Sequence, residues 1–96
     1  MSPKNRKKLD IIRFKLDKLD NRLLSLVKHR TKLVDEVLKL KEFKKEIVDK
    51  KRINIILKKI KAKSIKQGID PKITNRIWKN MIWSYIDYER RNFKKK

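Results

Sequence analysis

Charged side chains stand where helical spacing predicts apolar ones, and such side chains could bind a small anion. Arg30 and Lys41 continue an apolar row in the first half of the chain, and Glu89 continues a row near its end. Arg13 and Arg52 lie directly beside apolar residues. Long basic side chains often lay their stems on a core and keep the charge in water. Several cations and one acid on inward faces instead need a partner, because unpaired buried charge is costly. A compact dianion in a pocket between helices would supply one.

Few other residues of the chain could carry out chemistry. It has no cysteine and a single histidine, His29, so the sequence excludes a thiolate metal site and disfavours a histidine zinc site. It has no glycine-rich phosphate loop, and no histidine is placed to activate its serines as nucleophiles. We therefore expect no metal and no cofactor.

The elements that must position these residues are three helices, and we expect an all-α fold. Apolar residues recur at steps of three and four along the first helix, which is predicted to run from residue 9 to a break that begins near residue 43. They are Leu9, Ile12, Leu16, Leu19, Leu23, Leu26, Leu33 and Val37. The period falters over residues 43–48, and a second helix is predicted from about residue 49 to residue 67. Turn dipeptides and sustained alternation, the signals of strands, are absent from the sequence.

The strongest break in the chain is the sequence GIDP at residues 68–71. Gly68 suits the left-handed position that ends a helix, Asp70 suits an N-cap, and Pro71 suits the first position of a third helix. Two sets of apolar residues are predicted to face inward. In the second helix they are Ile53, Ile56, Leu57 and Ile60, and in the third they are Ile73, Ile77, Met81 and Tyr85.

The first predicted helix is too long for one small domain. About 34 residues make a helix roughly 50 Å long, whereas a compact chain of 96 residues is only about 30 Å across. The apolar row continues along the overhang, and no glycine or proline breaks the helix after Leu9. A second copy would cover the row, so we expect an intertwined homodimeric helical bundle. Residues 9–92 would form this domain, between basic tails at residues 1–8 and 93–96.

The net charge of +20 has two interpretations. It could mark a polyanion partner such as RNA or DNA. It could equally follow from a bias toward Lys, Ile and Asn, because the lysines are spread along the whole chain. No stretch of about 18 apolar residues predicts a membrane span, and no apolar segment follows the basic N-terminus as in a secretory signal. We expect a cytoplasmic protein.

Three segments of the sequence resemble the all-helical chorismate mutases. They are IRFKLDKLDNRLLSLVKHRTKLVDEVLKLK at residues 12–41, IVDKKR at residues 47–52, and GIDPKITNRIWKNMIWSYIDYE at residues 68–89. The first contains the family pattern of an Arg, an Ile/Leu-Asp-x-x-Leu-Leu motif, a second Arg, and a Lys eleven residues later. The resemblance covers about residues 9–92 and implies a dimer that shares its long first helix and rearranges chorismate to prephenate.

The resemblance also implies roles for individual residues. Arg13 would reach into the partner subunit's site, while Arg30 and Arg52 would bind the substrate carboxylates. Lys41 would contact a carboxylate and the ether oxygen, and Glu89 would lie beside the same oxygen. The catalytic residues would therefore be Lys41, Glu89 and Arg30. Asp49 matches an acid that meets the ring hydroxyl.

Two positions depart from the family pattern. Ile53 stands where many members have a Glu that also contacts the hydroxyl, and Tyr85 stands where a Ser often touches the ring carboxylate, although Ser84 is adjacent. The related isochorismate pyruvate lyases share the fold and most of these residues. Two alternatives are therefore an isochorismate pyruvate lyase and, from another class, a basic helical nucleic-acid-binding protein.

Overall fold

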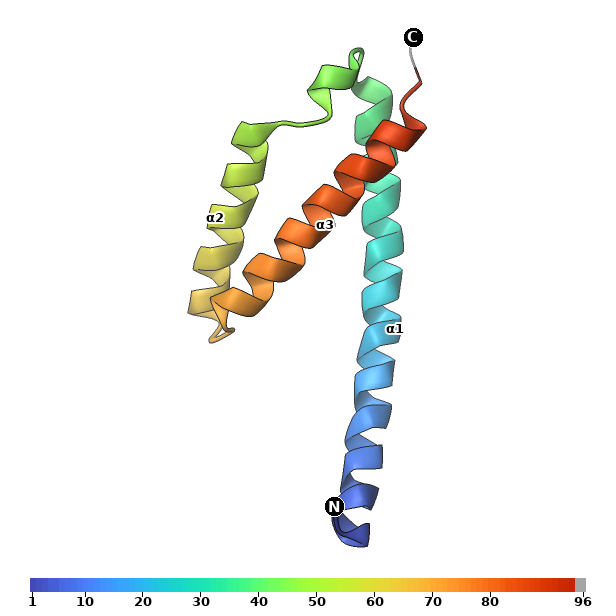
Figure 1. Cartoon of the computed structure of the whole chain (residues 1–96), viewed down its shortest axis with the longest axis vertical. Coiled ribbons are helices and arrows are strands. Elements are labelled where there is room, and N and C mark those ends of the chain that lie inside the picture. The colour runs from blue at the N-terminus through green and yellow to red at the C-terminus, as the bar shows by residue number, and fades with distance from the viewer. Residues whose placement is uncertain (95–96) are drawn as a thin grey trace. The chain divides into compact units, whose positions relative to one another are not determined.

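The computed structural model describes residues 1–94, and within them the chain is helical throughout, with no strand. The helices are α1 (Pro3–Leu40), α2 (Lys50–Lys66) and α3 (Pro71–Asn92), with a short 3-10 helix, η1 (Lys44–Glu46), between the first two (Figure 1). The all-α class and the three predicted helices are confirmed. The chain divides into two units, Met1–Leu33 and the part that begins at Val34, so α1 contributes to both.

The first unit consists of the first 31 residues of α1 and the two residues before them. The predicted start at Leu9 is too late, because the helix begins at Pro3. Ser2 acts as its cap: the backbone N–H of Asn5 donates to Ser2 Oγ at 3.2 Å, and proline is favoured at the first helical position. Residues 3–8, expected as part of a basic tail, are therefore helical.

The apolar row of α1 is mostly exposed in the single chain. Apart from Leu9, its members are between 48% and 66% exposed: Ile12, Leu16, Leu19, Leu23, Leu26, Leu33 and Val37. An α-helix with a continuous exposed apolar face has not yet buried the surface that would stabilise it. None of the helices that the structure describes combines the length and the apolar composition needed to cross a membrane.

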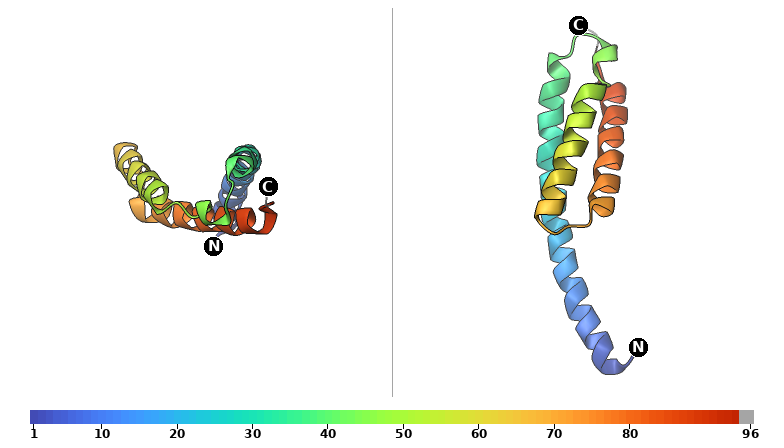
Figure 2. Two further views of the ribbon diagram at one scale, coloured as in Figure 1. Left: turned by 90° about the horizontal axis from the view of Figure 1, so that it is seen from above. Right: turned by 90° about the vertical axis from the view of Figure 1, so that its left-hand side faces the viewer.

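The second unit is built on the hairpin of α2 and α3, which run side by side from the turn that joins them (Figure 2). The turn has the predicted features. Gly68 has φ +71°, and the Asp70 carboxylate accepts a hydrogen bond from the backbone N–H of Lys72 at 2.9 Å. Near the turn, the hydroxyls of Ser64 and Thr74 are 2.8 Å apart and both residues are buried. This hydrogen bond joins the two helices.

The core of this unit is small. Only Leu38, Ile47, Ile82 and Ile86 are buried apolar residues among those described. Partly buried residues pack around them: Val48, Ile53, Ile56, Leu57 and Phe93. The inward face predicted for α2 is confirmed in part, because all four of its residues are partly buried. So small a core gives a chain of this length marginal stability by itself.

The inward face predicted for α3 is partly wrong. Ile73 and Ile77 are 56% and 51% exposed, whereas Thr74, Ile82, Ile86 and Glu89 are buried. A row at steps of four drifts around the helix, because four residues exceed one turn of 3.6. The row that begins at Ile73 therefore reaches the buried face only near its end. The predicted end of the domain at residue 92 coincides with the end of α3, and residues 95 and 96 of the expected C-terminal tail lie outside the described residues.

Candidate active site

An ion pair joins the ends of α1 and α3. Lys41 Nζ lies 3.1 Å from Glu89 Oε2, although the two residues are 48 positions apart in the sequence. The side chains are only 18% and 9% exposed. It connects residues that are distant in sequence, whereas the ion pair between Asp87 and Arg91 joins neighbouring turns of α3.

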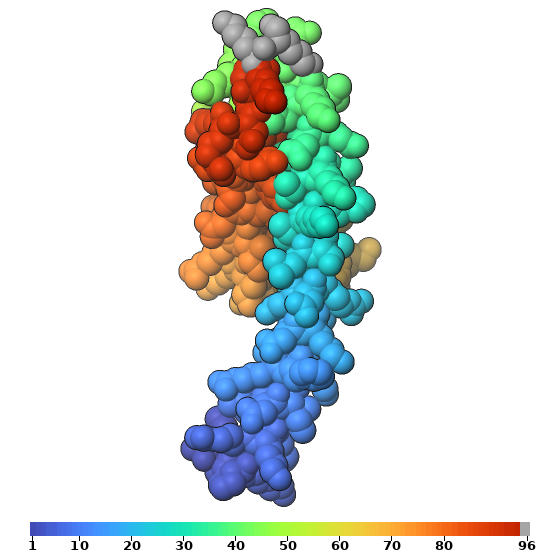
Figure 3. Space-filling model, turned by 90° about the vertical axis from the view of Figure 1, so that its right-hand side faces the viewer, coloured from blue at the N-terminus to red at the C-terminus, as the bar shows by residue number. Residues whose placement is uncertain are grey.

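Both residues of the pair extend the apolar core. Lys41 follows Leu38 by three residues, and its backbone N–H donates to the Leu38 carbonyl at 3.2 Å as the helix ends. Glu89 follows Ile86 by three residues on the buried face of α3. In Figure 3 the side chains at the end of α1 lie against those at the end of α3. The core therefore packs beneath the pair and removes it from bulk water, which strengthens its electrostatic interactions.

Three other predicted residues lie in the same unit. Tyr85 is one turn before Glu89 on α3 and is partly buried, and Asp49 and Arg52 lie at the start of α2 and are exposed. The Asp49 carboxylate caps α2 by accepting a hydrogen bond from the backbone N–H of Arg52 at 3.0 Å. A hollow of about 510 Å³ next to this cap is lined by Asp49 and its neighbours in sequence. The start of α2 can thus present one acid and one cation to a ligand.

The other two predicted residues belong to the first unit. Arg13 is exposed on α1, and Arg30, near the end of the unit, is partly buried. Of the seven predicted site residues, only Lys41 and Glu89 are brought into direct contact by a described ion pair.

Two residues that the sequence analysis missed lie beside the ion pair. Tyr88, adjacent to Glu89, donates a hydrogen bond from its hydroxyl to Asp35 Oδ1 at 2.7 Å. A signal for both was present: Asp35, Leu38 and Lys41 recur at steps of three, and Tyr88 follows Tyr85 by the same step. Residues at this spacing share a helix face.

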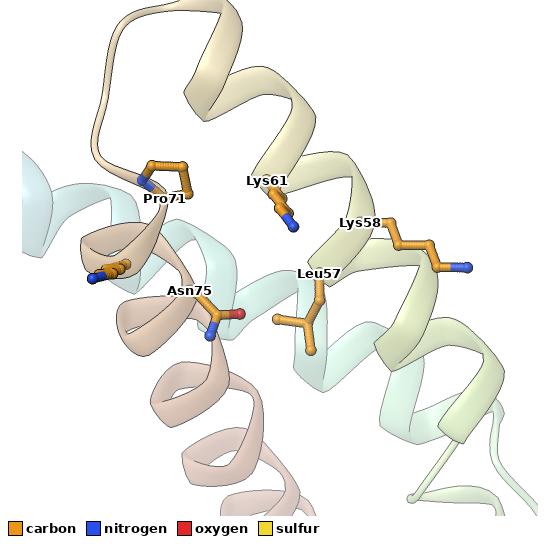
Figure 4. A pocket seen from close by; sticks show the side chains of 6 residues that line it. Leu57, Lys58, Lys61, Pro71 and Asn75 are labelled. Carbon is orange, nitrogen blue, oxygen red and sulfur yellow. The ribbon is translucent and has the colours of Figure 1, made fainter.

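A groove at the opposite end of the hairpin is a separate feature. It has a volume of about 350 Å³ and is lined by Leu57, Lys58, Lys61, Pro71, Lys72 and Asn75. Leu57 and Asn75 face each other across it, while Lys58 extends away (Figure 4). Asn75 precedes Glu89 by fourteen residues of α3, or about 21 Å of helix. This groove is therefore distinct from the ion pair.

Comparison with known proteins gives one result. The family model described as chorismate mutase type II matches residues 12–90, most of the chain and every predicted site residue. Neither the curated proteins nor the solved structures contain a match to the chain.

Proposed function

This chain belongs to the chorismate mutase type II family and is a chorismate mutase, and we propose that Lys41 and Glu89 act together at the reacting ether oxygen of the substrate. The observation that carries this proposal is their partly buried contact at 3.1 Å. The resemblance to the chorismate mutases implies that both residues lie at that oxygen, and each comes from a different helix end.

The rearrangement of chorismate to prephenate needs no covalent intermediate. Its main demand is that a flexible dianion be held in a folded, reactive conformer. As the C–O bond breaks, negative charge grows on the ether oxygen, and donors placed there stabilise the transition state more than the ground state. The Lys41 ammonium has three N–H donors. One contacts Glu89, so others remain for the oxygen and a carboxylate.

The remaining site residues would hold the substrate. Arg30 and Arg52 would bind its carboxylates, because a guanidinium pairs with a carboxylate through two parallel hydrogen bonds. Asp49 would accept a hydrogen bond from the ring hydroxyl, and Tyr85 would lie near the ring carboxylate. Arg13 would enter the site from a second copy of the chain.

A homodimer completes the proposal. The apolar row of α1 is about half exposed in the single chain, and only four apolar residues of the described part of the chain are buried. An antiparallel second α1 would bury both rows and carry its Arg13 toward this chain's site. Symmetric dimers of this kind are the commonest oligomers. We place the enzyme in the cytoplasm, where its reaction would serve aromatic amino acid biosynthesis.

The proposal is tested by following chorismate loss by absorbance and identifying the product. Prephenate is expected from chorismate, whereas salicylate and pyruvate released from supplied isochorismate, with chorismate left unchanged, would identify an isochorismate pyruvate lyase. Lys41→Met should lower kcat/KM by about 10²-fold or more, as for loss of one donor to a developing oxyanion. Lys44→Met removes the same charge from an exposed site three residues away and should leave kcat/KM near the wild-type value. Equal activity of the two variants would contradict the role of Lys41.

A further inference from the structure

A second polar contact joins α1 to α3 beside the ion pair. The Tyr88 hydroxyl donates to Asp35 Oδ1 at 2.7 Å, across 53 positions of sequence, and the contact is partly buried. A hydrogen bond from a hydroxyl to an ionised carboxylate is short and stronger than one between neutral groups. It joins the two helices directly, whereas the ion pair involves Lys41, the residue just after α1.

This contact is connected to the candidate active site on both helices. Asp35 lies on α1 six residues before Lys41, with Leu38 of the core midway between them. Tyr88 is adjacent to Glu89, and its ring packs edge-to-face on Tyr85, with centroids 6.3 Å apart and an interplanar angle of 86°. A shift of α3 along α1 would therefore break the contact and separate Lys41 from Glu89 together.

We propose that Asp35 and Tyr88 are positioning residues, which fix the end of α3 against the end of α1 so that Lys41, Glu89 and Tyr85 face the substrate correctly. The inference rests on the proposed function. Neither residue needs to touch substrate, because they act through their neighbours. Catalysis by oriented donors is sensitive to such support, since a misplacement of about 1 Å can cost about 10²-fold in rate.

The surroundings of the Tyr88 hydroxyl provide a spectroscopic reporter. The hydrogen bond to Asp35 raises the pKa of Tyr88, and burial, the Asp35 charge and Tyr85 act in the same direction, while the Arg91 guanidinium lowers it. The chain has only two tyrosines, Tyr85 and Tyr88. Tyrosinate absorbance during an alkaline titration can therefore be assigned by substitution.

Kinetics test the positioning role. Tyr88→Phe keeps the ring against Tyr85 and removes the hydrogen bond, so kcat should fall about fivefold to twentyfold while KM changes less than about twofold. Asp35→Asn keeps an acceptor and should retain more of kcat than Asp35→Leu. Glu36→Gln makes the matched charge change at the next, exposed residue and should behave as the wild type. Wild-type kcat in Tyr88→Phe would overturn the proposal.

A control variant separates positioning from stability. Thr74→Val breaks the buried Ser64–Thr74 hydrogen bond at the far end of the hairpin, so it should lower the melting temperature without lowering kcat. If it lowers kcat as much as Tyr88→Phe at the same loss of melting temperature, the effect is one of stability and the proposal is wrong.

The alkaline titration tests whether the hydrogen bond between Tyr88 and Asp35 is present. The late tyrosinate transition should disappear in Tyr88→Phe and move to lower pH in Asp35→Asn. An unchanged transition in Asp35→Asn means that the hydrogen bond is absent, which overturns the proposal even if chorismate is converted. A wild-type chain that does not convert chorismate overturns the proposed function and the positioning role with it, yet leaves the titration result valid.

Discussion

At the scale of single residues, the hydrogen bonds that the side chain at position 89 can make decide its part in catalysis. The Glu89 carboxylate accepts a hydrogen bond from Lys41 at 3.1 Å. An ionised carboxylate donates none and would repel the negative charge that develops on an ether oxygen beside it, whereas an amide can donate. An amide at this position should therefore serve the reaction at least as well as the carboxylate.

Glu89→Gln has a permanent donor and an acceptor for Lys41, so it should keep activity. Glu89→Ala should be slower by about 10²-fold, as for loss of one donor. Steady-state rates of both variants, measured under the same conditions as the wild type, check this expectation. A Glu89→Gln variant as slow as Glu89→Ala would disprove this role.

The sequence revealed Lys41 and Glu89 because each is a charge on an apolar row, whereas the spacing of Asp35 and Tyr88 shows only that each shares a helix face with a site residue. Asp35 lies on a helix with many other charged residues, and a tyrosine on a buried face is unremarkable in sequence. Only the three-dimensional structure shows that the hydroxyl and the carboxylate meet at 2.7 Å. A contact between residues 53 positions apart leaves no local pattern.

At the scale of elements, residues at the helix ends serve both structure and chemistry. Asp49 caps α2 through the Arg52 N–H, yet it is also the acid proposed to meet the substrate hydroxyl. The turn at residues 68–71 was predicted correctly, because Gly, Asp and Pro act locally through backbone conformation and hydrogen bonding. The caps formed by Ser2 and Asp49 were not predicted. The face of α3 was predicted less well, since burial depends on how the helix packs, which its own sequence does not determine.

Substitutions at Asp49 should separate its two roles. Asn is as good an N-cap as Asp, so Asp49→Asn should keep the wild-type melting temperature while KM rises. Asp49→Ala loses the cap as well and should reduce the free energy of unfolding by about 1 kcal/mol. Urea unfolding and steady-state kinetics on both variants measure the difference. Equal stability of Asn and Ala variants would show that the cap contributes nothing.

Replacing Gly68 should destabilise the chain because of its left-handed backbone conformation alone. Its φ of +71° is unfavourable for any other residue, yet a Cβ atom built there meets nothing within 4 Å. Gly68→Ala should therefore reduce the free energy of unfolding by about 1–2 kcal/mol, without altering KM, because the turn is at the far end of the hairpin. A loss of substrate binding in a stable Gly68→Ala variant would contradict this view.

At the scale of the whole molecule, the exposed row of α1 predicts a dimer with shared sites. Sedimentation should give about twice the chain mass of 11.8 kDa at micromolar concentration. Arg13→Ala and Arg30→Ala should each be inactive, but mixed dimers would contain one intact site of two. Because random exchange makes half of the dimers mixed, an equal mixture should recover about a quarter of wild-type activity. A folded monomer, or no recovery after verified subunit exchange, would rule out the shared site.

The net charge of +20 should increase the rate at which the substrate reaches the enzyme. A basic surface raises the encounter rate of a dianion, and salt screens this attraction. We expect kcat/KM to fall as sodium chloride is raised, while kcat at saturating chorismate stays constant. Sucrose at equal osmolarity is the control.

Nucleic acid should bind only weakly and without sequence preference. Nanomolar, sequence-selective binding at physiological salt would contradict the proposal that the basic surface serves to attract the substrate.

The half-exposed apolar row of α1 also has a kinetic consequence. If two rows must meet before either is buried, the final folding step is an encounter between two chains, whose rate depends on their concentration. Refolding from urea should then be second-order at low protein concentration, with a half-time that lengthens on dilution. Great dilution should separate the dimer into partly folded, inactive monomers. Activity should return when the chains are concentrated again, because the monomers can then associate.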